Sequence, residues 1–498
     1  MDEGDERSSL DENRLTAARL AKVADLRDAG VEPYPYRFER DALAADLHER
    51  HRDLGPGAET GERVVVAGRL MAVRDMGSLA FGVLADTSGR IQLFVDESAL
   101  GESYAAFVSL DVGDWIGAEG EVVTTRRGEL SVRIAGFTLL AKGLRPLPEK
   151  WHGLKDVEQR HRQRYVDLIV NADARDIAMK RIATVESLRR SLADRGFMAV
   201  ETPMLHTLPT GGLATPFETH HQALGMGMYL RIAIELHLKR LVVGGMERVY
   251  EIGRVFRNEG VSTTHNPEFT MLEVYQALAD YTDMIDLTEA IVVEAAMAVV
   301  GSTELEYKGE TLSFAAPWAR IDYFTSVSEA TNVDWDPEMD LEVARTAAAV
   351  AGVEVNEAWG VGKLAAEVFE KLVEPTLWNP TIVLDFPKEI SPLAREHRSH
   401  PGLVERFEVI VAGTELANAF SELNDPVEQR HRFEAQVEAR SAGDIEAHLM
   451  DEDYLRALEY GLPPTGGMGM GVDRLVMFLT GEESVREVIL FPHLRPEG

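Results

Sequence analysis

Carboxylate, arginine and aromatic side chains recur at strand-like spacing in two nearby segments. Residues 249–259 read VYEIGRVFRNE, and residues 269–275 read FTMLEVY. Side chains alternate between the two faces of a strand. The polar and aromatic side chains that this alternation places together are Arg257 and Glu259 in the first segment, and Phe269, Glu273 and Tyr275 in the second. This composition predicts a site for a nucleotide and a cationic small molecule rather than a plain core.

A third segment strengthens this prediction. Residues 415–422 read ELANAFSE, and alternation places Asn418, Phe420 and Glu422 on one face. Burying an uncompensated carboxylate is costly, so Glu422 and Glu273 near each other require a metal ion or an ammonium group. An aromatic ring beside them suits an aliphatic stem that ends in that ammonium. The alternative is that both glutamates are exposed on edge strands.

A glycine-rich segment precedes a predicted helix near the C-terminal end. Residues 461–481 read GLPPTGGMGMGVDRLVMFLTG, and the helix is expected from about Val472. Glycines let a backbone approach a flat ligand closely, and Arg474 would face that ligand. The segment is neither a P-loop nor a GxGxxG turn. The histidines lack metal-ligand spacing, and no Gly-x-Ser-x-Gly motif or cysteine nucleophile is present.

The elements that must position these residues divide into several predicted regions. A chain of 498 residues suggests two to four domains. We expect an acidic, helical N-terminal extension over 1–62, five short strands forming an OB-type barrel over 63–147, and a linker over 148–175. The remainder, 176–498, mixes helices and strands and carries a helical insertion at about 301–385. The N-terminal helix has an apolar stripe and should end at Gly30; the stripe is Leu15, Leu20, Val23 and Leu26.

Composition excludes several functional classes. The net charge of −33, from 51 basic and 84 acidic residues, disfavours a general nucleic-acid binder but permits a local basic track. The chain has no cysteine, hence no disulfide and no thiolate metal site. No apolar run approaches the roughly 20 residues of a membrane span, and the acidic start is no signal peptide. We therefore expect a cytoplasmic protein.

Three motifs give the chain a resemblance to a known family. ADRGFMAVETPML (193–205), FRNEG through HNPEF (256–269) and GMGMGVDRL (467–475) resemble motifs 1, 2 and 3 of class II aminoacyl-tRNA synthetases. ELANAFSELND together with HNPEFT resembles the lysine enzyme, lysyl-tRNA synthetase, within that class. The resemblance covers essentially the whole length. It implies an α+β protein, with an N-terminal OB-fold anticodon-binding barrel and a catalytic domain built on a mainly antiparallel sheet flanked by helices.

The resemblance also implies roles for individual residues. The catalytic residue would be Arg257. The lysine-binding residues would be Gly211, Glu235, Arg257, Glu273, Tyr275, Asn418, Phe420, Glu422 and Gly469. The ATP-binding residues would be Arg257, Glu259, His265, Asn266, Phe269, Glu408 and Arg474. The ligands of Mg²⁺, of which the family binds up to three per active site, would be Glu408 and Glu415, and the anticodon-binding residues would be Arg69, Phe81 and Gln92.

The activity implied is ATP-dependent ligation of lysine to tRNA(Lys) through a lysyl-adenylate, by a homodimer that does not associate with membranes. The first step needs no catalytic base, because the lysine carboxylate is already a nucleophile. Catalysis would then consist of positioning and of charge stabilisation by Arg257 and Mg²⁺. The barrel would stack splayed anticodon bases on aromatic side chains.

The chain departs from its relatives at four positions near these motifs. Ile234 replaces a proline and His237 a tyrosine, Thr264 stands where many bacterial relatives have arginine, and Thr215 stands where a basic residue is frequent. These departures leave the lysine-contacting positions intact. They raise the alternative hypothesis of a specialised or repurposed lysyl-tRNA synthetase paralogue.

Four other interpretations compete with lysine ligation. The nearest is an aspartyl or asparaginyl synthetase, but an aspartate pocket needs a cation for the side-chain carboxylate, which Glu273 and Glu422 would repel. An enzyme that lysylates a protein side chain generally lacks the barrel predicted here. A single-stranded nucleic-acid binder would leave the carboxylate strands unexplained. An inactive regulatory paralogue is disfavoured by the intact Arg257, Glu408, Glu415 and Arg474.

Overall fold

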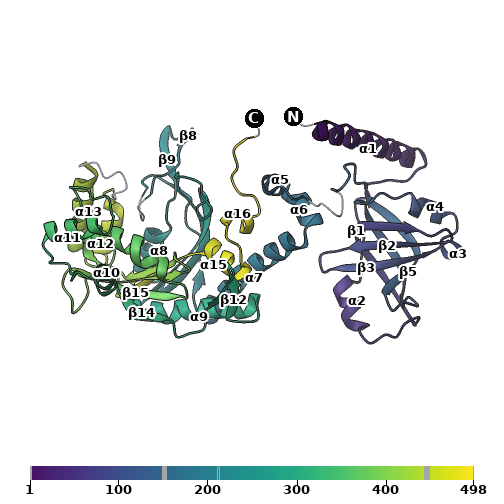
Figure 1. Ribbon diagram of the computed structural model, residues 1–498. Helices are drawn as coiled ribbons and strands as arrows, with labels where there is room; N and C mark the ends of the chain where they lie inside the picture. The colour runs from purple at the N-terminus through teal and green to yellow at the C-terminus, as the bar shows by residue number, and fades with distance from the viewer. Residues whose placement is uncertain (1–2, 149–153, 210, 212–213, 442–448, 497–498) are drawn as a thin grey trace. The chain divides into compact units, whose positions relative to one another are not determined.

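The computed structural model describes residues 3–148, 154–209, 211, 214–441 and 449–496 (Figure 1). The chain divides into two compact units, Met1–Leu154 and Lys155–Gly498. Residues 149–153 of the predicted linker lie outside the described residues. The described part of that linker forms two short helices, α5 (Val157–Arg162) and α6 (Arg164–Val170), both in the second unit.

The first unit is built on a closed five-stranded barrel with the strand order β1-β2-β3-β5-β4. Its strands are β1 (Glu59–Asp75), β2 (Leu79–Ala85), β3 (Arg90–Asp96), β4 (Trp115–Thr124) and β5 (Leu130–Ala141). Short helices follow β3 and precede β1; these are α3 (Glu97–Leu100), α4 (Ser103–Val108) and α2 (Ala44–Arg50). In β2 every second residue is buried, as expected for a strand with one face in a core. The predicted barrel is confirmed.

Two glycines allow the barrel strands to approach each other closely. A Cβ on Gly68 would lie 2.3 Å from the carbonyl oxygen of Ala85, and one on Gly120 would lie 2.2 Å from that of Arg133. Both distances are far shorter than any carbon–oxygen contact, so a side chain at either position would push neighbouring strands apart.

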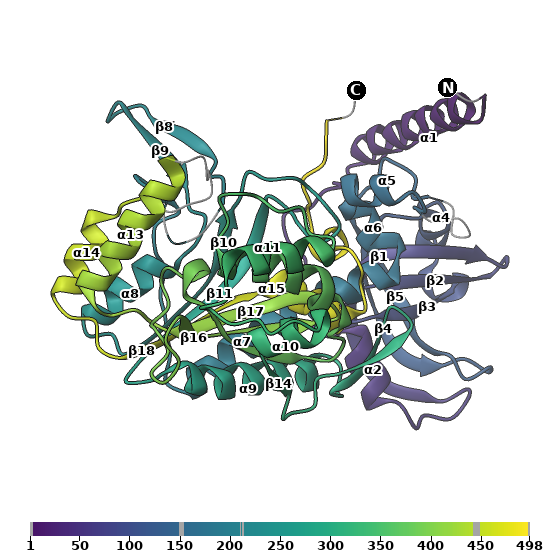
Figure 2. The same ribbon diagram turned by 60° about the vertical axis from the view of Figure 1, so that its left-hand side comes forward.

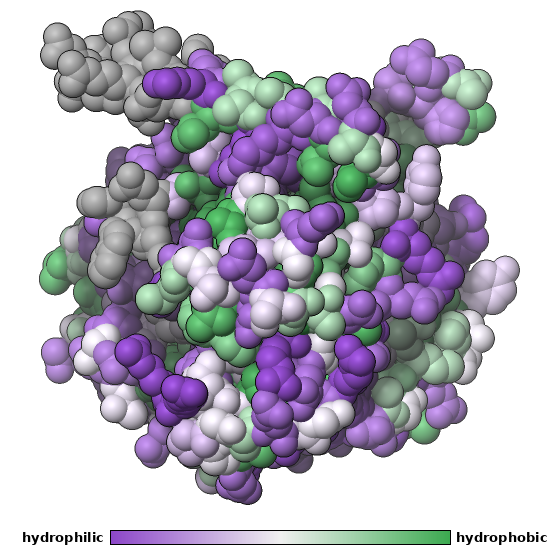
Figure 3. Space-filling model, turned by 90° about the vertical axis from the view of Figure 1, so that its right-hand side faces the viewer, coloured by the Kyte–Doolittle hydropathy of each residue, from purple (hydrophilic) through white to green (hydrophobic). Residues whose placement is uncertain are grey.

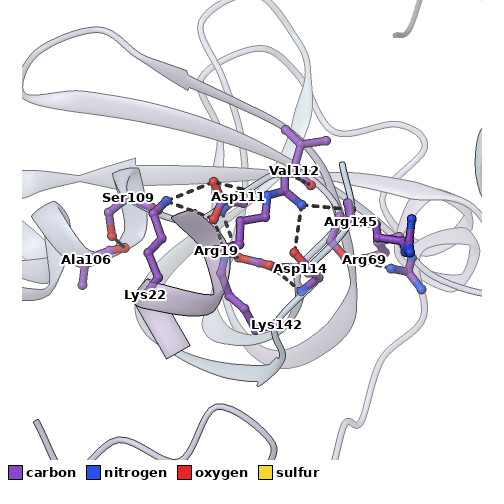
Figure 4. A network of polar contacts seen from close by, with 12 residues as sticks. Arg19, Lys22, Arg69, Ala106, Ser109, Asp111, Val112, Asp114, Lys142 and Arg145 are labelled. Atoms are coloured by element: carbon purple, nitrogen blue, oxygen red, sulfur yellow. Dashed lines mark hydrogen bonds and ion pairs between the residues drawn. The ribbon is translucent and has the colours of Figure 1, made fainter. Parts of the chain in front are cut away.

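Helix α1 (Glu3–Asp28) docks on the barrel unit mainly through polar contacts (Figure 4). The Arg19 guanidinium donates to the carbonyl oxygens of Gly143 (2.8 Å), Arg145 (3.1 Å) and Val112 (3.3 Å). Lys22 pairs with Asp111 at 2.9 Å. Of the predicted apolar stripe, Val23 is buried and Leu26 half-buried, whereas Leu15 and Leu20 are about half exposed. The stripe therefore accounts for only part of the docking.

The second unit is built on an eight-stranded sheet with the order β14-β15-β16-β17-β18-β11-β10-β6. The strands are β6 (Met198–Ala199), β10 (Arg248–Phe256), β11 (Glu268–Ala277), β14 (Ala319–Asp322), β15 (Thr381–Pro387), β16 (Leu403–Val411), β17 (Thr414–Ser421) and β18 (Thr465–Gly471). Only the β6–β10 and β14–β15 pairs are parallel. The predicted mainly antiparallel sheet flanked by helices is confirmed.

One face of this sheet packs on the main apolar core. The helices that cover it are α7 (Ala172–Asp194), α9 (Tyr281–Val299) and α15 (Val472–Thr480). Figures 1 and 2 show α9 running along this face. Leu272 and Val274 of β11 point into the core, so Glu273 and Tyr275 point to the opposite face. Alternation thus separates core from site along one strand.

The opposite face packs against helices α8 (Glu235–Val243), α13 (Pro426–Ser441) and α14 (Glu452–Glu459), whose buried residues cluster with Tyr275 of β11. The hairpin β12 (Glu304–Tyr307) and β13 (Glu310–Ser313) and helix α16 (Val485–Val488) instead join the main core. A separate small sheet contains β7 (Leu205–His206), β8 (Glu218–His221) and β9 (Met226–Leu230). The β8–β9 hairpin extends away from the main sheet in both views (Figures 1 and 2).

The segment predicted as a helical insertion contains both helices and strands. Its helices are α10 (Tyr323–Thr331), α11 (Leu341–Val350) and α12 (Val361–Val368), followed by a π-helix (Phe369–Val373) and 3-10 turns at Glu374–Thr376 and, just beyond the segment, Lys388–Ile390. The same stretch, 301–385, also contributes β12, β13, β14 and most of β15. Since β14 and β15 complete the main sheet, only the part between them is an added helical layer.

On the face of the molecule shown in Figure 3, hydrophilic and hydrophobic residues are interspersed. Such a mixture is ordinary for a surface that faces water. Among the described residues, no helix is both long and apolar enough to cross a lipid bilayer.

Candidate active site

The second unit contains a cavity of about 540 Å³ over the face of the sheet opposite α9 and α15. The predicted site residues that line it are Gly211, Glu235, Arg257, Glu259, His265, Asn266, Phe269, Glu273, Tyr275, Glu408, Glu415, Asn418, Phe420, Gly469 and Arg474. Glu422 is buried next to the cavity and does not line it. Strands β11 and β17 flank β18 inside the sheet, which excludes the alternative of exposed glutamates on edge strands.

Two of the predicted strand positions lie just outside their strands. Strand β10 ends at Phe256. The Arg257 amide still donates to the Pro267 carbonyl, but Pro267 has no N–H to return, and the Asn258 amide donates to the Thr215 carbonyl instead. Arg257 and Glu259 therefore reach the cavity from the connection after β10 and not from its face. Glu422 likewise follows the last residue of β17.

One end of the cavity is rich in buried carboxylates. Glu273 accepts hydrogen bonds from the Tyr275 hydroxyl (2.8 Å) and from the Ile234 amide (3.3 Å). Burial, followed by the nearby charge of Glu235, raises the pKa of Glu273 to about 7. Burial likewise raises the pKa of Glu422 well above its ordinary value. Oxygen Oε1 of Glu422 is buried without a hydrogen-bond partner. This end can accept hydrogen bonds from a cation.

Lys239 is a functional candidate that the sequence reasoning missed. Its Nζ lies 2.5 Å from Oε1 of Glu235 and forms an ion pair with Glu422. The four-residue spacing from Glu235 on helix α8 was the available signal. That signal identifies one partner only, because Glu422 is brought close by the fold.

The glycines of the glycine-rich segment lie mainly in strand β18, directly before the predicted helix, which is α15. A Cβ on Gly467 would lie 1.9 Å from Oε1 of Glu422 and 2.5 Å from the Tyr275 ring. Glycine is therefore required at position 467, because a side chain there would overlap the Glu422 carboxylate and the Tyr275 ring. A Cβ added at Gly469 would lie 3.4 Å from its nearest neighbour, the Cε atom of Met271. This distance is an ordinary van der Waals contact, so the protein alone does not require glycine at this position.

The other end of the cavity carries donors and an aromatic ring. The Arg257 guanidinium lies 5.3 Å from the centre of the Phe269 ring, and its Nε is buried without a hydrogen-bond partner. Burial lowers the pKa of Arg257 from its ordinary value, although the group stays protonated. Arg474 donates to the Glu415 carbonyl oxygen. Two guanidinium groups at one end of a cavity suit an anionic ligand such as a polyphosphate.

His265 and Asn266 lie in the connection between β10 and β11. The Nδ1 atom of His265 is 3.0 Å from the Ser262 hydroxyl and 3.1 Å from the Thr264 hydroxyl. Burial, then the charge of Arg474, lowers the pKa of His265, so the ring is neutral at neutral pH. Oxygen Oδ1 of Asn266 is buried and has no hydrogen-bond partner. Both residues therefore offer neutral polar groups to a ligand.

Glu408 and Glu415 fit a divalent cation. They lie on the adjacent strands β16 and β17, and each interacts electrostatically with the other. Burial raises the pKa of Glu408 to about 7, and the Glu415 charge adds to that shift, while Arg406 opposes it. A divalent cation between them would relieve this repulsion. Among the described residues no three His, Cys, Asp or Glu side chains form a metal site, so phosphate oxygens and water would complete the coordination.

The π-helix after α12 brings a further carboxylate to the cavity. Glu370 lines it, and burial raises the pKa of this group. Its neighbour Glu374 has a pKa raised to about 7 by burial and by the charge of Glu370. Sequence reasoning assigned no polar site residue to the insertion, and no local pattern could have shown that a π-helix turns this side chain toward the sheet.

The predicted anticodon residues lie on neighbouring strands of the barrel. Phe81 stacks on Phe94, with ring centres 5.5 Å apart and planes inclined by 28°. Gln92 donates to the Ser131 hydroxyl at 2.9 Å. Arg69 donates to the Gly113 carbonyl at 2.8 Å and lies 5.4 Å from the Trp115 ring centre.

Arg74 is a basic residue that sequence reasoning missed, and it lies directly across from Phe81 in the β1–β2 register. Ala80 and Leu84 of β2 fill the barrel interior, so Phe81 faces outward. The outward-facing surface of β1, β2 and β3 therefore carries aromatic, amide and basic groups together.

The four departures from the expected motifs have defined environments. The Ile234 amide donates to Glu273, and a proline could not supply this N–H. His237 packs on His206, with ring centres 4.6 Å apart, and burial lowers the pKa of His206 to about 4. The Thr264 hydroxyl contacts His265, and the Thr215 carbonyl accepts from Asn258.

Comparison with known proteins agrees with this geometry. Residues 156–495 match the family described as tRNA synthetases class II (D, K and N), and residues 64–140 match the OB-fold nucleic acid binding domain. The chain therefore belongs to the class II tRNA synthetases, as its three motifs predicted. Two similar curated relatives are named Lysine--tRNA ligase. One, from Thermosynechococcus vestitus, is 53% identical over 97% of each chain; the other, from Moorella thermoacetica, is 51% identical over 98% of this chain and 99% of its own.

Proposed function

We propose that the protein ligates L-lysine to tRNA(Lys) with ATP, through a lysyl-adenylate. The observation that carries the proposal is the buried pair Glu273 and Glu422 at one end of a cavity whose other end holds Arg257 and Arg474. The names of relatives that are more than half identical over nearly the whole length support it. The buried carboxylates would repel an aspartate side chain, and the neutral amide of asparagine would leave their charge uncompensated, which disfavours both of these members of the family.

The lysine would lie along the sheet from Arg257 to Glu422. Its ε-ammonium would contact Glu273, Tyr275 and Glu422, and its stem would pack on Phe420. Glu235 and the Gly211 backbone would receive the α-ammonium. The Gly469 backbone and the Asn418 side chain would lie beside the substrate carboxylate, and Arg257 would pair with that carboxylate. The lining of the cavity by all of these except Glu422 supports this arrangement.

ATP would occupy the end with the two arginines. Phe269 would stack on adenine, Glu259, His265 and Asn266 would contact the nucleotide, and Arg474 would pair with the γ-phosphate. Glu408 and Glu415 would hold Mg²⁺. When bound, Mg²⁺ neutralises phosphate charge and aligns the pyrophosphate leaving group.

The first step joins the two substrates. The lysine carboxylate oxygen attacks the α-phosphorus, and the bond from that phosphorus to the bridging oxygen breaks to release pyrophosphate. Arg257 stabilises the charge that builds on the α-phosphate. In the second step a ribose hydroxyl at the tRNA 3′ end attacks the lysyl carbonyl, and AMP leaves.

The barrel would bind the anticodon. Phe81 and Phe94 offer a stacked aromatic surface for an unpaired base, and Gln92 offers an amide for its edge. Arg69 is already engaged with the Gly113 carbonyl, so Arg74 is better placed than Arg69 to contact a phosphate or base beside Phe81.

We also propose a homodimer that works in the cytoplasm. Helix α7 exposes Met179 and Ile182, and the edge strand β6 exposes Met198, each side chain 43–54% exposed. These residues fall in or near the motif 1 segment. A second copy of the chain that packs there would cover apolar surface and the open edge of the sheet.

ATP–pyrophosphate exchange with each of the twenty amino acids, without tRNA, tests the proposal. We expect lysine to support exchange and the other amino acids to give none above background. Exchange with aspartate or asparagine instead of lysine would overturn the substrate assignment. No exchange despite binding of lysine and ATP would indicate an inactive or repurposed paralogue.

A further inference from the structure

Lys239 places a positive charge at the carboxylate-rich end of the cavity. Its side chain is fully buried, and its Nζ is held by Glu235 and Glu422. The ring centres of Phe420, Tyr275 and Tyr454 lie 5.4, 6.0 and 5.9 Å from Nζ. Burial alone would lower the pKa of Lys239, but the charges of Glu235 and Glu422 raise it above its ordinary value. Lys239 is therefore a permanent cation.

The charges at this end of the cavity are unbalanced without a ligand. Glu235, Glu273 and Glu422 supply three carboxylates, and Lys239 supplies one ammonium. When all are ionised, the group carries two net negative charges. The unpartnered oxygen of Glu422 is a sign of this excess, and the Glu235 charge adds to the effect of burial in raising the pKa of Glu273. A ligand with two ammonium groups would neutralise it.

We propose that Lys239 is a specificity-determining residue, whose ammonium sets the net charge of this carboxylate group to match the two ammonium groups of lysine. The inference rests on the proposed function. Lys239 then has two effects. Its ammonium holds Glu235 and Glu422 in one arrangement, and it neutralises one of the three carboxylates, so that the ligand needs to supply only two positive charges. Amino acids with a single ammonium group leave the site one positive charge short.

Single substitutions change the balance in opposite directions. Lys239→Met removes the cation with little change of shape and leaves three carboxylates for two substrate ammonium groups. Glu422→Gln removes one carboxylate and leaves one net negative charge. The double variant restores two negative charges, from Glu235 and Glu273. It should therefore bind lysine better than the Glu422→Gln variant, although it differs from the native protein at two buried positions.

The experiment measures the lysine KM, the ATP KM and the preference for lysine over norleucine in ATP–pyrophosphate exchange by the full chain. Norleucine has the α-ammonium and an uncharged side chain. We expect Glu422→Gln to raise the lysine KM about tenfold or more and to reduce the preference for lysine. Adding Lys239→Met should recover most of both losses. The ATP KM should change less than about twofold in each variant, because ATP lies at the other end.

Lys363→Met is the matched control. Lys363 forms an ion pair with Glu367 at the same four-residue helical spacing, on α12, and lies outside the cavity lining. It should leave the lysine KM and the preference unchanged. If the Lys239→Met variant does not fold, as judged by circular dichroism, the comparison of the lysine KM between Glu422→Gln and the double variant still tests the inference.

Two outcomes would overturn the inference. One is a double variant with a higher lysine KM than the Glu422→Gln variant. The other is a folded Lys239→Met variant with native lysine KM and native preference. Exchange with lysine by the native protein distinguishes these outcomes from failure of the proposed function. If the native protein catalyses this exchange, the proposed function is supported whatever the variants show.

Discussion

At the scale of the residue, the candidate site is defined by carboxylates that resist ionisation. Glu273 is buried and its pKa is raised to about 7, chiefly by burial. In the unfolded chain the same group would ionise near its ordinary pKa of about 4.3. Between roughly these two pH values the Glu273 carboxyl group is therefore protonated in the folded protein and ionised in the unfolded chain. A cationic ligand would stabilise the ionised form in the folded protein.

Lowering the pH should weaken lysine binding when ATP and Mg²⁺ are kept saturating. The ε-ammonium of lysine stays charged throughout this range, whereas Glu273 gains a proton below about pH 7. We expect the lysine KM to rise up to about tenfold per pH unit below 7, measured by exchange at saturating ATP and Mg²⁺. Glu273→Gln should flatten this dependence. A lysine KM that is constant from pH 8 to pH 6 would contradict the assignment.

Glu273 should also limit stability at high pH. A carboxyl group whose pKa is raised on folding makes the protein less stable as pH rises from its unfolded to its folded pKa. Glu273→Gln should therefore raise the free energy of unfolding by about 1–3 kcal/mol at pH 8 and by less at pH 5. Urea unfolding at the two pH values, without ligands, measures the difference. A variant that is equally or more destabilised at pH 8 than at pH 5 would refute this account.

At the scale of the element, polar side chains fix where helices dock. Residues 13–28 of α1 bury little apolar surface, and the Arg19 guanidinium donates to three carbonyl oxygens of the barrel unit. Below it, Lys142 pairs with Asp114 at 2.7 Å, and both side chains are almost fully buried. Figure 4 shows that these groups form one connected network, so α1 depends on a few charged contacts.

Arg19→Ala should release α1 from the barrel unit without unfolding the barrel. Loss of hydrogen bonds from a charged group costs about 2 kcal/mol, which corresponds to about thirtyfold faster amide exchange in the helix. Hydrogen–deuterium exchange followed by mass spectrometry measures this for residues 13–28 and, separately, for the barrel strands. Arg14→Ala, on the exposed side of the same helix, is the matched control and should change neither. Equal exchange in the two variants would show that Arg19 does not hold the helix.

At the scale of the whole molecule, the two units divide the proposed work. The amino acid and ATP residues all lie in Lys155–Gly498, whereas the anticodon residues lie in Met1–Leu154. Changes in the barrel should therefore affect reactions that need tRNA and spare those that do not.

Phe81→Ala should impair tRNA charging and leave lysine-dependent exchange unchanged. Loss of stacking on one base costs about 1–3 kcal/mol, so we expect kcat/KM for tRNA to fall about fivefold to a hundredfold. Tyr36→Ala, which removes a fully exposed aromatic ring from the same unit, serves as the control. Equal charging by the native protein and the Phe81 variant would count against the anticodon assignment.

Ile182→Glu should disrupt the proposed homodimer. This side chain is 54% exposed on α7, and a charge there would be buried if a second copy covered it. Sedimentation velocity should show a shift from dimer to monomer at micromolar concentration, with Val350→Glu, the same kind of change at an exposed apolar residue of α11, as control. A native protein that sediments as a monomer would reject the homodimer.

The sequence by itself determined most of the site's composition and the type of each domain. Alternation in 269–275 separated Glu273 and Tyr275 from the core residues Leu272 and Val274. Side chains alternate along any strand, and this alternation depends on local backbone geometry and not on the tertiary fold. Five short strands with turn residues between them were sufficient to predict a barrel. The three motifs identified the family, because their residues are close in sequence.

Only the tertiary structure decided which groups meet. Lys239 pairs with Glu422 across 183 positions of sequence, and the Glu415 carbonyl accepts from Arg474. Glu370 reaches the cavity from a segment in which sequence reasoning had placed no site residue. Sequence patterns report which face of an element is buried, whereas contacts between distant elements depend on sheet order and on packing. The charge balance of the site therefore became visible only once the fold had brought its four ionisable groups together.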